Sequence, residues 1–302
     1  MLEQGCSDRS PKKLFNTIKE DTIMPLVINT NTAASIAAST LNVSNSQLEK
    51  SLARLSSGSR ITAPSDDAGG LAVAMKINSA TKRTSAVLNN IGNALSYLQT
   101  QDGALQTVAK ILDRMSELKV MHGDPTKSGS DRGNYATEFK ALQMQLNNLT
   151  AEKFNGVDLF VAAAQTLDIA ITEAGDKSVS ITQAGLSGED GLKVANQDAN
   201  NLADAANAID SVGITIENIR TAIQSIATMR AQNGAEASQL LFASDVLIVN
   251  RTNLEAARSR IMDTDIAAES SDLAKNTILV QAGIAMLGQA NTLPQAALKL
   301  LS

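Results

Sequence analysis

Residues 209–226, IDSVGITIENIRTAIQSI, decide the fold class, because their apolar side chains recur at alternating spacings of three and four. Such spacing is typical of the seam between packed long helices. Its members are Ile209, Val212, Ile216, Ile219, Ile223 and Ile226. A compatible seven-residue register in the N-terminal half comprises Leu88, Ile91, Leu95, Leu98, Leu105 and Leu112. The two patterns predict long helices that pack side by side.

Few residues break these patterns, so the chain divides into a small number of helices. The expected helices cover about 35–55, 66–121, 134–151, from near 201 to beyond 260, and 267–291. The predicted breaks are Ser57-Gly58, Ala63-Pro64, Gly123-Asp124-Pro125, the polar turn 128–133, the junction from Asp263 to Asp265, and Pro294.

Short alternating runs interrupt the helical pattern in the middle of the chain. Residues 167–171 and 179–181 alternate apolar and polar side chains on either side of Gly175, which predicts a β-hairpin. Asn155-Gly156 is a strong turn signal before it. The sequence therefore predicts a mainly α-helical, elongated bundle with a small β-hairpin region near 155–200.

The composition suits such a bundle and argues against two kinds of partner. Aromatic residues are 2% of the 302 residues, so the 43% hydrophobic content consists mainly of small aliphatic side chains, which suit close helix packing. A net charge of −5 provides no basic field for phosphates. No apolar run reaches the roughly 18 residues of a membrane span. We expect neither nucleic-acid binding nor membrane insertion.

Residues that could carry chemistry are scarce. The chain has one cysteine, Cys6, and one histidine, His122, so no zinc-type ligand set can form. Asp66 and Asp67 are adjacent, and neighbours on a helix point apart rather than toward one substrate. We expect no enzyme, no metal and no cofactor.

The first 23 residues differ in texture from the rest. They are charged and irregular, whereas Met24 begins a segment of small polar and apolar residues. We interpret residues 1–23 as an appended or disordered extension and Met24 as the true start. No apolar stretch long enough for a secretory signal follows Lys12 and Lys13.

The apolar positions of residues 35–55 and 267–301 have no cover in the chain except each other. A bare pair of helices is marginal in water, because backbone ordering opposes the burial of a few leucines. The pair becomes stable when neighbouring subunits complete the packing. The alternative is that both ends fold back onto the central bundle. A contact of one subunit's tip with another's base is heterologous, and it gives a helical filament if it does not close a ring.

Four stretches carry a resemblance to a known family. They are residues 24–35, MPLVINTNTAAS; residues 52–74, LARLSSGSRITAPSDDAGGLAVA; residues 131–160, which end in TAEKFNGVDLF; and residues 254–293, LEAARSRIMDTDIAAESSDLAKNTILVQAGIAMLGQANTL. In order and spacing they resemble the bacterial flagellins, from Met24 to Ser302.

The resemblance implies a fold, a function and a place outside the cell. Flagellins are exported unfolded by a type III apparatus and polymerise under a cap into the motility filament. Carried over, residues 24–65 and 261–302 would form an inner tube, and 66–260 an outer-tube bundle. The variable outer domains of longer flagellins are missing. The expected partners are further copies of the chain, the flagellar cap, hook-associated proteins, an export chaperone and the export apparatus.

The resemblance and the apolar pattern together suggest residues for these contacts. The expected assembly residues are Leu41, Leu48, Leu52, Leu55, Arg54, Arg60, Arg258, Arg260, Asp263, Leu273, Ile284 and Leu287. The expected chaperone anchors are Leu273, Ile278, Leu287 and Leu298. An epitope of an innate immune receptor matches at Arg114, Glu117 and Leu118, but Asp113 and Ser116 depart from its pattern.

Three other functions remain open at the level of sequence. A hook–filament junction protein shares the terminal helices, although the stretch 257–261 and the flagellin-like ending favour the filament. A cytoplasmic coiled-coil binding module would not be secreted. A protease would need a His-Glu-x-x-His motif, which the sequence does not contain.

Overall fold

The computed structural model describes residues 30–186, 209 and 214–300, with the side chains of 293–300 left out. The described residues are mainly α-helical, as predicted, with two small β-hairpins. The chain divides into two compact units. We call Met1–Thr62 with Thr264–Ser302 the terminal unit, and Ala63–Asp263 the central unit.

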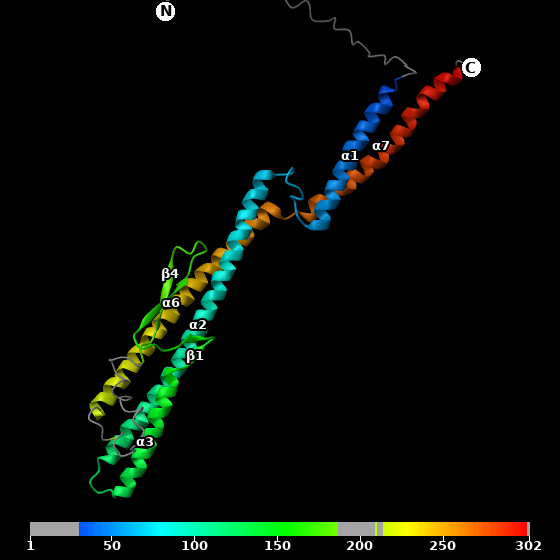
Figure 1. The fold of residues 1–302 in the computed structure, drawn as a ribbon. Helices are drawn as coiled ribbons and strands as arrows, with labels where there is room; N and C mark the ends of the chain where they lie inside the picture. The colour runs from blue at the N-terminus through cyan, green and yellow to red at the C-terminus, as the bar shows by residue number, and fades with distance from the viewer. Residues whose placement is uncertain (1–29, 187–208, 210–213, 301–302) are drawn as a thin grey trace, which may run out of the picture. The chain divides into compact units, whose positions relative to one another are not determined.

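The terminal unit is a pair of long helices from opposite ends of the chain, α1 (Thr32–Ser57) and α7 (Ile266–Leu300), which lie side by side in Figure 1. Helix α1 ends at Gly58, whose φ of 68° lies in the left-handed region that favours glycine. Helix α7 begins after Asp265, whose carboxylate accepts hydrogen bonds from the backbone N–H groups of Ala267 and Ala268. The predicted break and junction are confirmed.

The sequence pattern predicted that the last helix would end before Pro294, and this prediction is wrong. The helix continues to Leu300, although a proline lacks the N–H that would bond to the carbonyl four residues earlier. That carbonyl belongs to Ala290, and it accepts a hydrogen bond of 2.8 Å from the Asn31 side-chain amide. The neighbouring segment thus satisfies the group that the proline leaves unpaired.

The central unit is built on three helices, α2 (Ala68–His122), α3 (Gly129–Thr150) and α6 (Ile216–Met262), and α2 packs along both of the others. The predicted seam of α2 is confirmed. Its buried members are Ile91, Leu98, Leu105 and Leu112, with Leu88 and Leu95 half-buried beside them. Phe139 and Leu146 of α3 complete this core, as their spacing predicted.

Three helix starts differ from the prediction. Helix α2 starts at Ala68, after an Asp67 cap, rather than at Asp66. Helix α3 starts at Gly129 because Ser128 and Asp131 form a capping box, so the predicted polar turn is wrong. Helix α6 starts at Ile216 with Thr215 as its cap.

The start of α6 interrupts the 209–226 seam. Ile214 and Thr215 are not helical, and Ile216 is 47% exposed, whereas Ile219 and Ile226 are buried. Ile209 is also buried, but it precedes the cap, so one continuous helix does not carry the whole seam. The predicted beginning near Asn201 lies outside the described residues.

Two hairpins complete the central unit. Strands β1 (Lys153–Phe154) and β2 (Val157–Asp158) are joined by Asn155 and Gly156, both with positive φ, the type I′ geometry that Asn-Gly favours. Strands β3 (Gln165–Ala170) and β4 (Ser178–Gln183) pair antiparallel, with Leu167 opposite Ile181. The predicted hairpin is confirmed.

Polar contacts attach both hairpins to the helices. The Tyr97 hydroxyl on α2 donates to the Asp158 carbonyl at 2.9 Å, and burial is the main cause that raises its pKa. Glu236 of α6, only 4% exposed, accepts from the Thr182 N–H at 2.9 Å and its hydroxyl at 2.7 Å. Since β4 carries Thr182, this carboxylate holds the β3–β4 hairpin against α6.

Candidate assembly surfaces

The two terminal helices contact each other along a seam with a seven-residue repeat. On α1 the buried or half-buried positions that follow this repeat are Ala34, Ala37, Leu41, Ser44, Leu48, Ser51 and Leu55. On α7 those that follow the repeat are Glu269, Leu273, Asn276, Val280, Gly283, Leu287 and Ala290. Such spacing is that of a two-stranded coiled coil. Five predicted assembly residues therefore lie in a seam within the chain: Leu41, Leu48, Leu55, Leu273 and Leu287.

Leu41 and Gly283 show how closely the two helices approach. A Cβ placed on Gly283 would lie 3.1 Å from Leu41 Cδ1, so the leucine occupies the space that a larger residue would need. Gly283 was not among the predicted residues, although it stands seven residues after Asn276 and seven before Ala290. That repeat is the signal by which sequence reasoning could have found it.

Polar side chains interrupt the apolar seam. Arg54, a predicted assembly residue, places its guanidinium 3.4 Å from Glu269, whose side chain is 10% exposed. Ser44, Ser51 and Asn276 are buried along the same seam. Polar residues in a coiled-coil seam fix register and orientation at some cost in stability. These groups therefore favour one alignment of α1 with α7.

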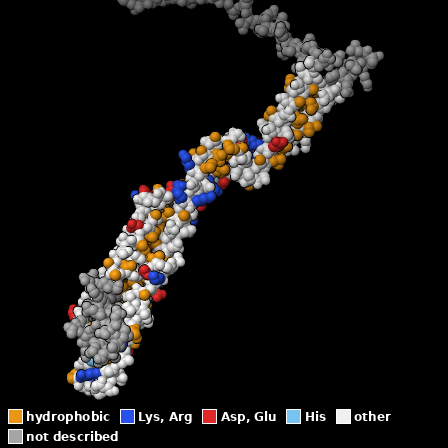
Figure 2. Space-filling model, in the orientation of Figure 1, with side chains coloured by type: hydrophobic (Ala, Val, Ile, Leu, Met, Phe, Trp, Pro, Cys, Tyr) orange, Lys and Arg blue, Asp and Glu red, His pale blue; other side chains and the backbone are white. Residues whose placement is uncertain are grey.

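The outward faces of the terminal unit carry a second set of large apolar side chains. Leu52, Ile278 and Ile284, all expected at contacts, are between 50% and 65% exposed. Further exposed members are Ile36, Val43, Ile266, Leu279 and Met286. Hydrophobic side chains are visible on the surface of this unit in Figure 2. Exposed apolar surface of this extent is typical of an interaction site.

The other predicted assembly residues are charged and mostly exposed. Arg60 and Arg260 are exposed, and Arg258 places Nη1 3.4 Å from the Asn78 side-chain oxygen. Asp263 caps the end of α6 and accepts a hydrogen bond of 2.6 Å from the Ser259 hydroxyl. The Leu298 side chain lies outside the described residues.

The three epitope-like residues differ in accessibility. Arg114 pairs with Glu138 at 2.7 Å and with Glu117 at 2.9 Å. These hydrogen bonds raise the pKa of the Arg114 guanidinium, and the bond to Glu138 contributes most. Leu118 is fully buried in the central core, so only Arg114 and Glu117 are available to a partner.

Among the side chains that the structure describes, in residues 30–186, 209 and 214–292, no three His, Cys, Asp or Glu gather as a metal site would require. The helices described there include none with the length and apolar character needed to cross a bilayer.

The sequence of this chain is similar to those of known proteins over both helical regions. Residues 28–166 match the family model of the bacterial flagellin N-terminal helical region, and residues 216–301 match that of the C-terminal helical region. The flagellar filament 30.7 kDa core protein of Treponema maltophilum is 31% identical over 286 residues, covering 92% of this chain and 100% of the relative. The flagellar filament 33 kDa core protein of Treponema phagedenis is 32% identical over 292 residues, with 91% and 100% covered. The flagellin of Bacillus subtilis is 32% identical over 311 residues, with 91% and 99% covered.

Proposed function

Because this chain belongs to the bacterial flagellin family, we propose that it is the structural subunit of a flagellar filament and works by self-association. The observation that supports the proposal is the distribution of apolar side chains on the terminal unit. Its helices use one set of apolar residues on each other and leave another set, including Leu52 and Ile284, exposed. Neighbouring copies would cover that second set.

The finer parts of the function follow from the family. We propose that the terminal unit contributes to the inner tube of the filament and that the central unit contributes to its outer tube. The subunit leaves the cell unfolded through the type III apparatus with an export chaperone. It is then added beneath the flagellar cap, beyond the hook-associated proteins. Its role is structural rather than enzymatic, and its place is extracellular.

A hook–filament junction protein is not favoured. The relatives that match over more than nine-tenths of this chain are named filament core proteins and flagellins. The two functions predict different phenotypes for a strain that lacks this gene. We expect such a strain to lose filaments yet keep its hook-associated proteins on the cell surface.

Seeded polymerisation of the purified full-length chain tests the proposal most directly. Monomer obtained by heating and cooling, mixed with short filament fragments, should grow filaments visible by electron microscopy. The matched control is the same chain without residues 267–302, which lacks nearly all of α7. Absence of growth from the complete chain over a wide concentration range would contradict the proposed function.

A further inference from the structure

The chain contains two asparagine–glycine pairs, and the structure places them in opposite surroundings. Asn155-Gly156 forms the exposed turn between β1 and β2. Asn233-Gly234 lies inside the long helix α6, where Asn233 is only 4% exposed. The two pairs are chemically alike, so the fold is expected to decide any large difference in their reactivity.

An asparagine followed by a glycine can modify itself without an enzyme. The backbone nitrogen of the glycine attacks Cγ of the asparagine side chain, and a cyclic imide forms. The bond from Cγ to Nδ2 breaks, and ammonia leaves with the hydrogen that the glycine nitrogen has lost. Water then opens the imide on either side, which gives an aspartate or an isoaspartate, whose backbone runs through Cγ. Glycine favours the attack because it has no side chain beside the nitrogen.

The turn at Asn155 leaves the attacking nitrogen available. The strand pairing ends with Phe154 opposite Val157, so the two turn residues lie outside it. Within the described part of the chain, neither the Gly156 N–H nor the Asn155 side chain makes a hydrogen bond. Apart from the neighbours of Gly156 in the chain, no described atom lies within 4 Å of the point where its Cβ would stand. Both reacting groups are therefore open to solvent.

The attack also requires the backbone of the turn to move. Asn155 has a φ of 50°, in the left-handed region, and its ψ must rotate before the Gly156 nitrogen reaches Cγ. Strands β1 and β2 have two residues each, and so short a hairpin is marginally stable by itself. Brief opening of this turn therefore requires little free energy.

Helix α6 opposes the same reaction at Asn233. The helix is continuous from Ile216 to Met262, and a helical N–H donates to the carbonyl four residues earlier. The Gly234 nitrogen is therefore held in the helix, and the Asn233 side chain is buried. Reaction at this pair requires the surrounding turns of α6 to open first.

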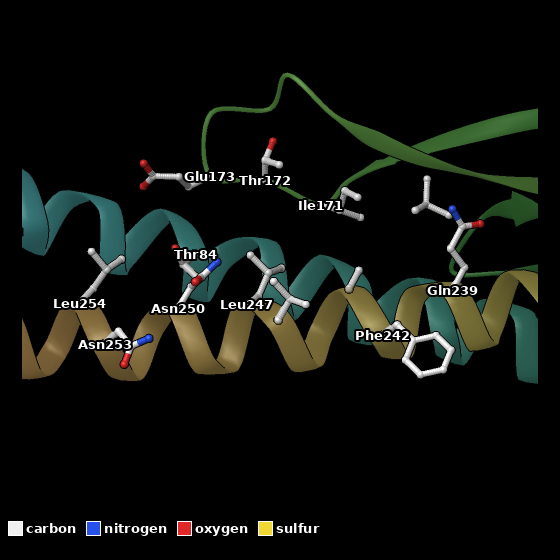
Figure 3. A pocket seen from close by; sticks show the side chains of 13 residues that line it. Thr84, Ile171, Thr172, Glu173, Gln239, Phe242, Leu247, Asn250, Asn253 and Leu254 are labelled. Atoms are coloured by element: carbon white, nitrogen blue, oxygen red, sulfur yellow. The ribbon is translucent and has the colours of Figure 1, made fainter.

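Two exposed asparagines of the same helix separate the effect of exposure from that of backbone conformation. Figure 3 shows Asn250 and Asn253 on the continuous ribbon of α6, and both are exposed. The backbone nitrogens that would attack them belong to Arg251 and Leu254, whose side chains hinder the approach. We expect both asparagines to stay intact although solvent reaches them.

We propose that Asn155 is a site of spontaneous deamidation and that α6 keeps Asn233 intact. The product changes the turn in two ways, because a carboxylate replaces a neutral amide and an isoaspartate adds one atom to the backbone. Since turn length sets the register of a hairpin, the longer turn cannot keep Phe154 opposite Val157 in the present geometry. This modification goes beyond self-association and does not depend on it.

The first test measures conversion at each asparagine by peptide mass spectrometry, after the folded full-length chain has aged at neutral and at mildly alkaline pH. We expect Asn155 to convert at least about tenfold faster than Asn233, because the free energy of opening α6 lowers the reactive population there. Conversion should be faster at the higher pH, because the attacking nitrogen must lose its proton. Circular dichroism checks that the chain stays helical during ageing.

The second test removes the fold and keeps the sequence. In the same chain unfolded by urea, Asn155 and Asn233 should convert at rates within about twofold of each other, because neither the turn nor the helix remains. This comparison needs no substitution, so it does not depend on whether a variant folds. It also controls for the different residues that precede the two pairs.

The products identify the route. Chromatography should separate two peptides of equal mass, one with aspartate and one with isoaspartate at position 155, because the imide opens on either side. Aspartate alone, equal rates at the two pairs in the folded chain, or an intact Asn155 while the unfolded chain converts would each overturn the proposal. A rate difference that persists unchanged in urea would assign it to neighbouring residues and overturn the protective role of α6.

Discussion

Asn31 shows how one side chain can connect the two ends of a chain. Its side-chain oxygen caps α1 by accepting from the Ala34 N–H at 3.0 Å. Its amide nitrogen donates to the Ala290 carbonyl, 259 residues away in sequence. The cap could be predicted from a short polar residue before a helix. The second bond could not, because no local pattern reports a contact over that separation.

Replacing Asn31 by aspartate should separate these two roles. The carboxylate of the Asn31→Asp variant still caps α1 but cannot donate to Ala290, so the terminal pair should lose about 1–3 kcal/mol. In a Pro294→Ala background the loss should be smaller by at least about 1 kcal/mol, since residue 294 then supplies the missing N–H. Hydrogen exchange of the α7 amides measures both costs. Equal losses in the two backgrounds would show that the proline plays no part.

Glu236 is a second residue whose importance sequence reasoning missed. A glutamic acid on a long helix is usually solvated, and nothing in its neighbours indicates that a strand will lie over it. The structure surrounds the carboxylate with the Thr182 N–H, the Thr182 hydroxyl and the Gln232 amide, which is 2.8 Å away. The hairpin therefore depends on an acceptor at this position.

Glu236→Gln should destabilise the central unit by about 1–3 kcal/mol, because an amide N–H₂ would face donors that need an acceptor. The matched control is Glu138→Gln, which removes an exposed ion pair with Arg114 and should cost less than about 1 kcal/mol. Urea unfolding followed by circular dichroism measures both. Similar costs for the two variants would mean that the Thr182 contacts contribute little.

At the scale of elements, the sequence predicted the body of each helix better than its ends. The inner faces of α2 and α3 and both turns followed from spacing and from Asn-Gly or glycine signals. The start of α3 was missed because Gly129 and Gly133 lower helix propensity, while the capping box of Ser128 and Asp131 compensates. The start of α6 was missed because the apolar spacing continues across Thr215. In the structure Thr215 caps the helix, so α6 begins only after it.

The capping box of α3 gives a prediction about pH. The Ser128 side-chain hydrogen bond is the largest cause that lowers the pKa of Asp131 from 3.8. A depressed carboxyl pKa means that the stabilisation is present above 3.8 and is lost as pH falls through the lower, folded value. NMR titration of the Asp131 carboxyl carbon should give a midpoint below 3.8. Ser128→Ala should move that midpoint upward, and an unchanged midpoint would exclude the hydroxyl as the cause.

At the scale of the whole molecule, the first and last described helices build one unit. The apolar pattern left each helix no cover in the chain except the other, and it included Leu41, Leu48, Leu273 and Leu287 among the expected contact residues. It did not identify the polar members, Glu269 and Asn276, because polar side chains on a long helix are expected in solvent. Their burial becomes evident only when the partner helix is in place.

Deleting residues 267–302 should abolish polymerisation and leave most of the helical signal of the central unit. The deletion removes the partner of α1 together with the exposed side chains Ile278, Ile284 and Met286. Electron microscopy and circular dichroism measure the two results. Deleting residues 1–23 is the control, and we expect it to leave filament growth unchanged. Filaments of normal length from the C-terminal deletion would refute the role of α7.

The distance in sequence between α1 and its partner also determines when the pair can form in a living cell. Arg54 and Glu269 are 215 residues apart, and a ribosome adds roughly 5–20 residues per second. The nascent α1 segment therefore waits on the order of 10–40 s before its partner is synthesised. Throughout that interval its leucines are open to whatever escorts a newly made chain.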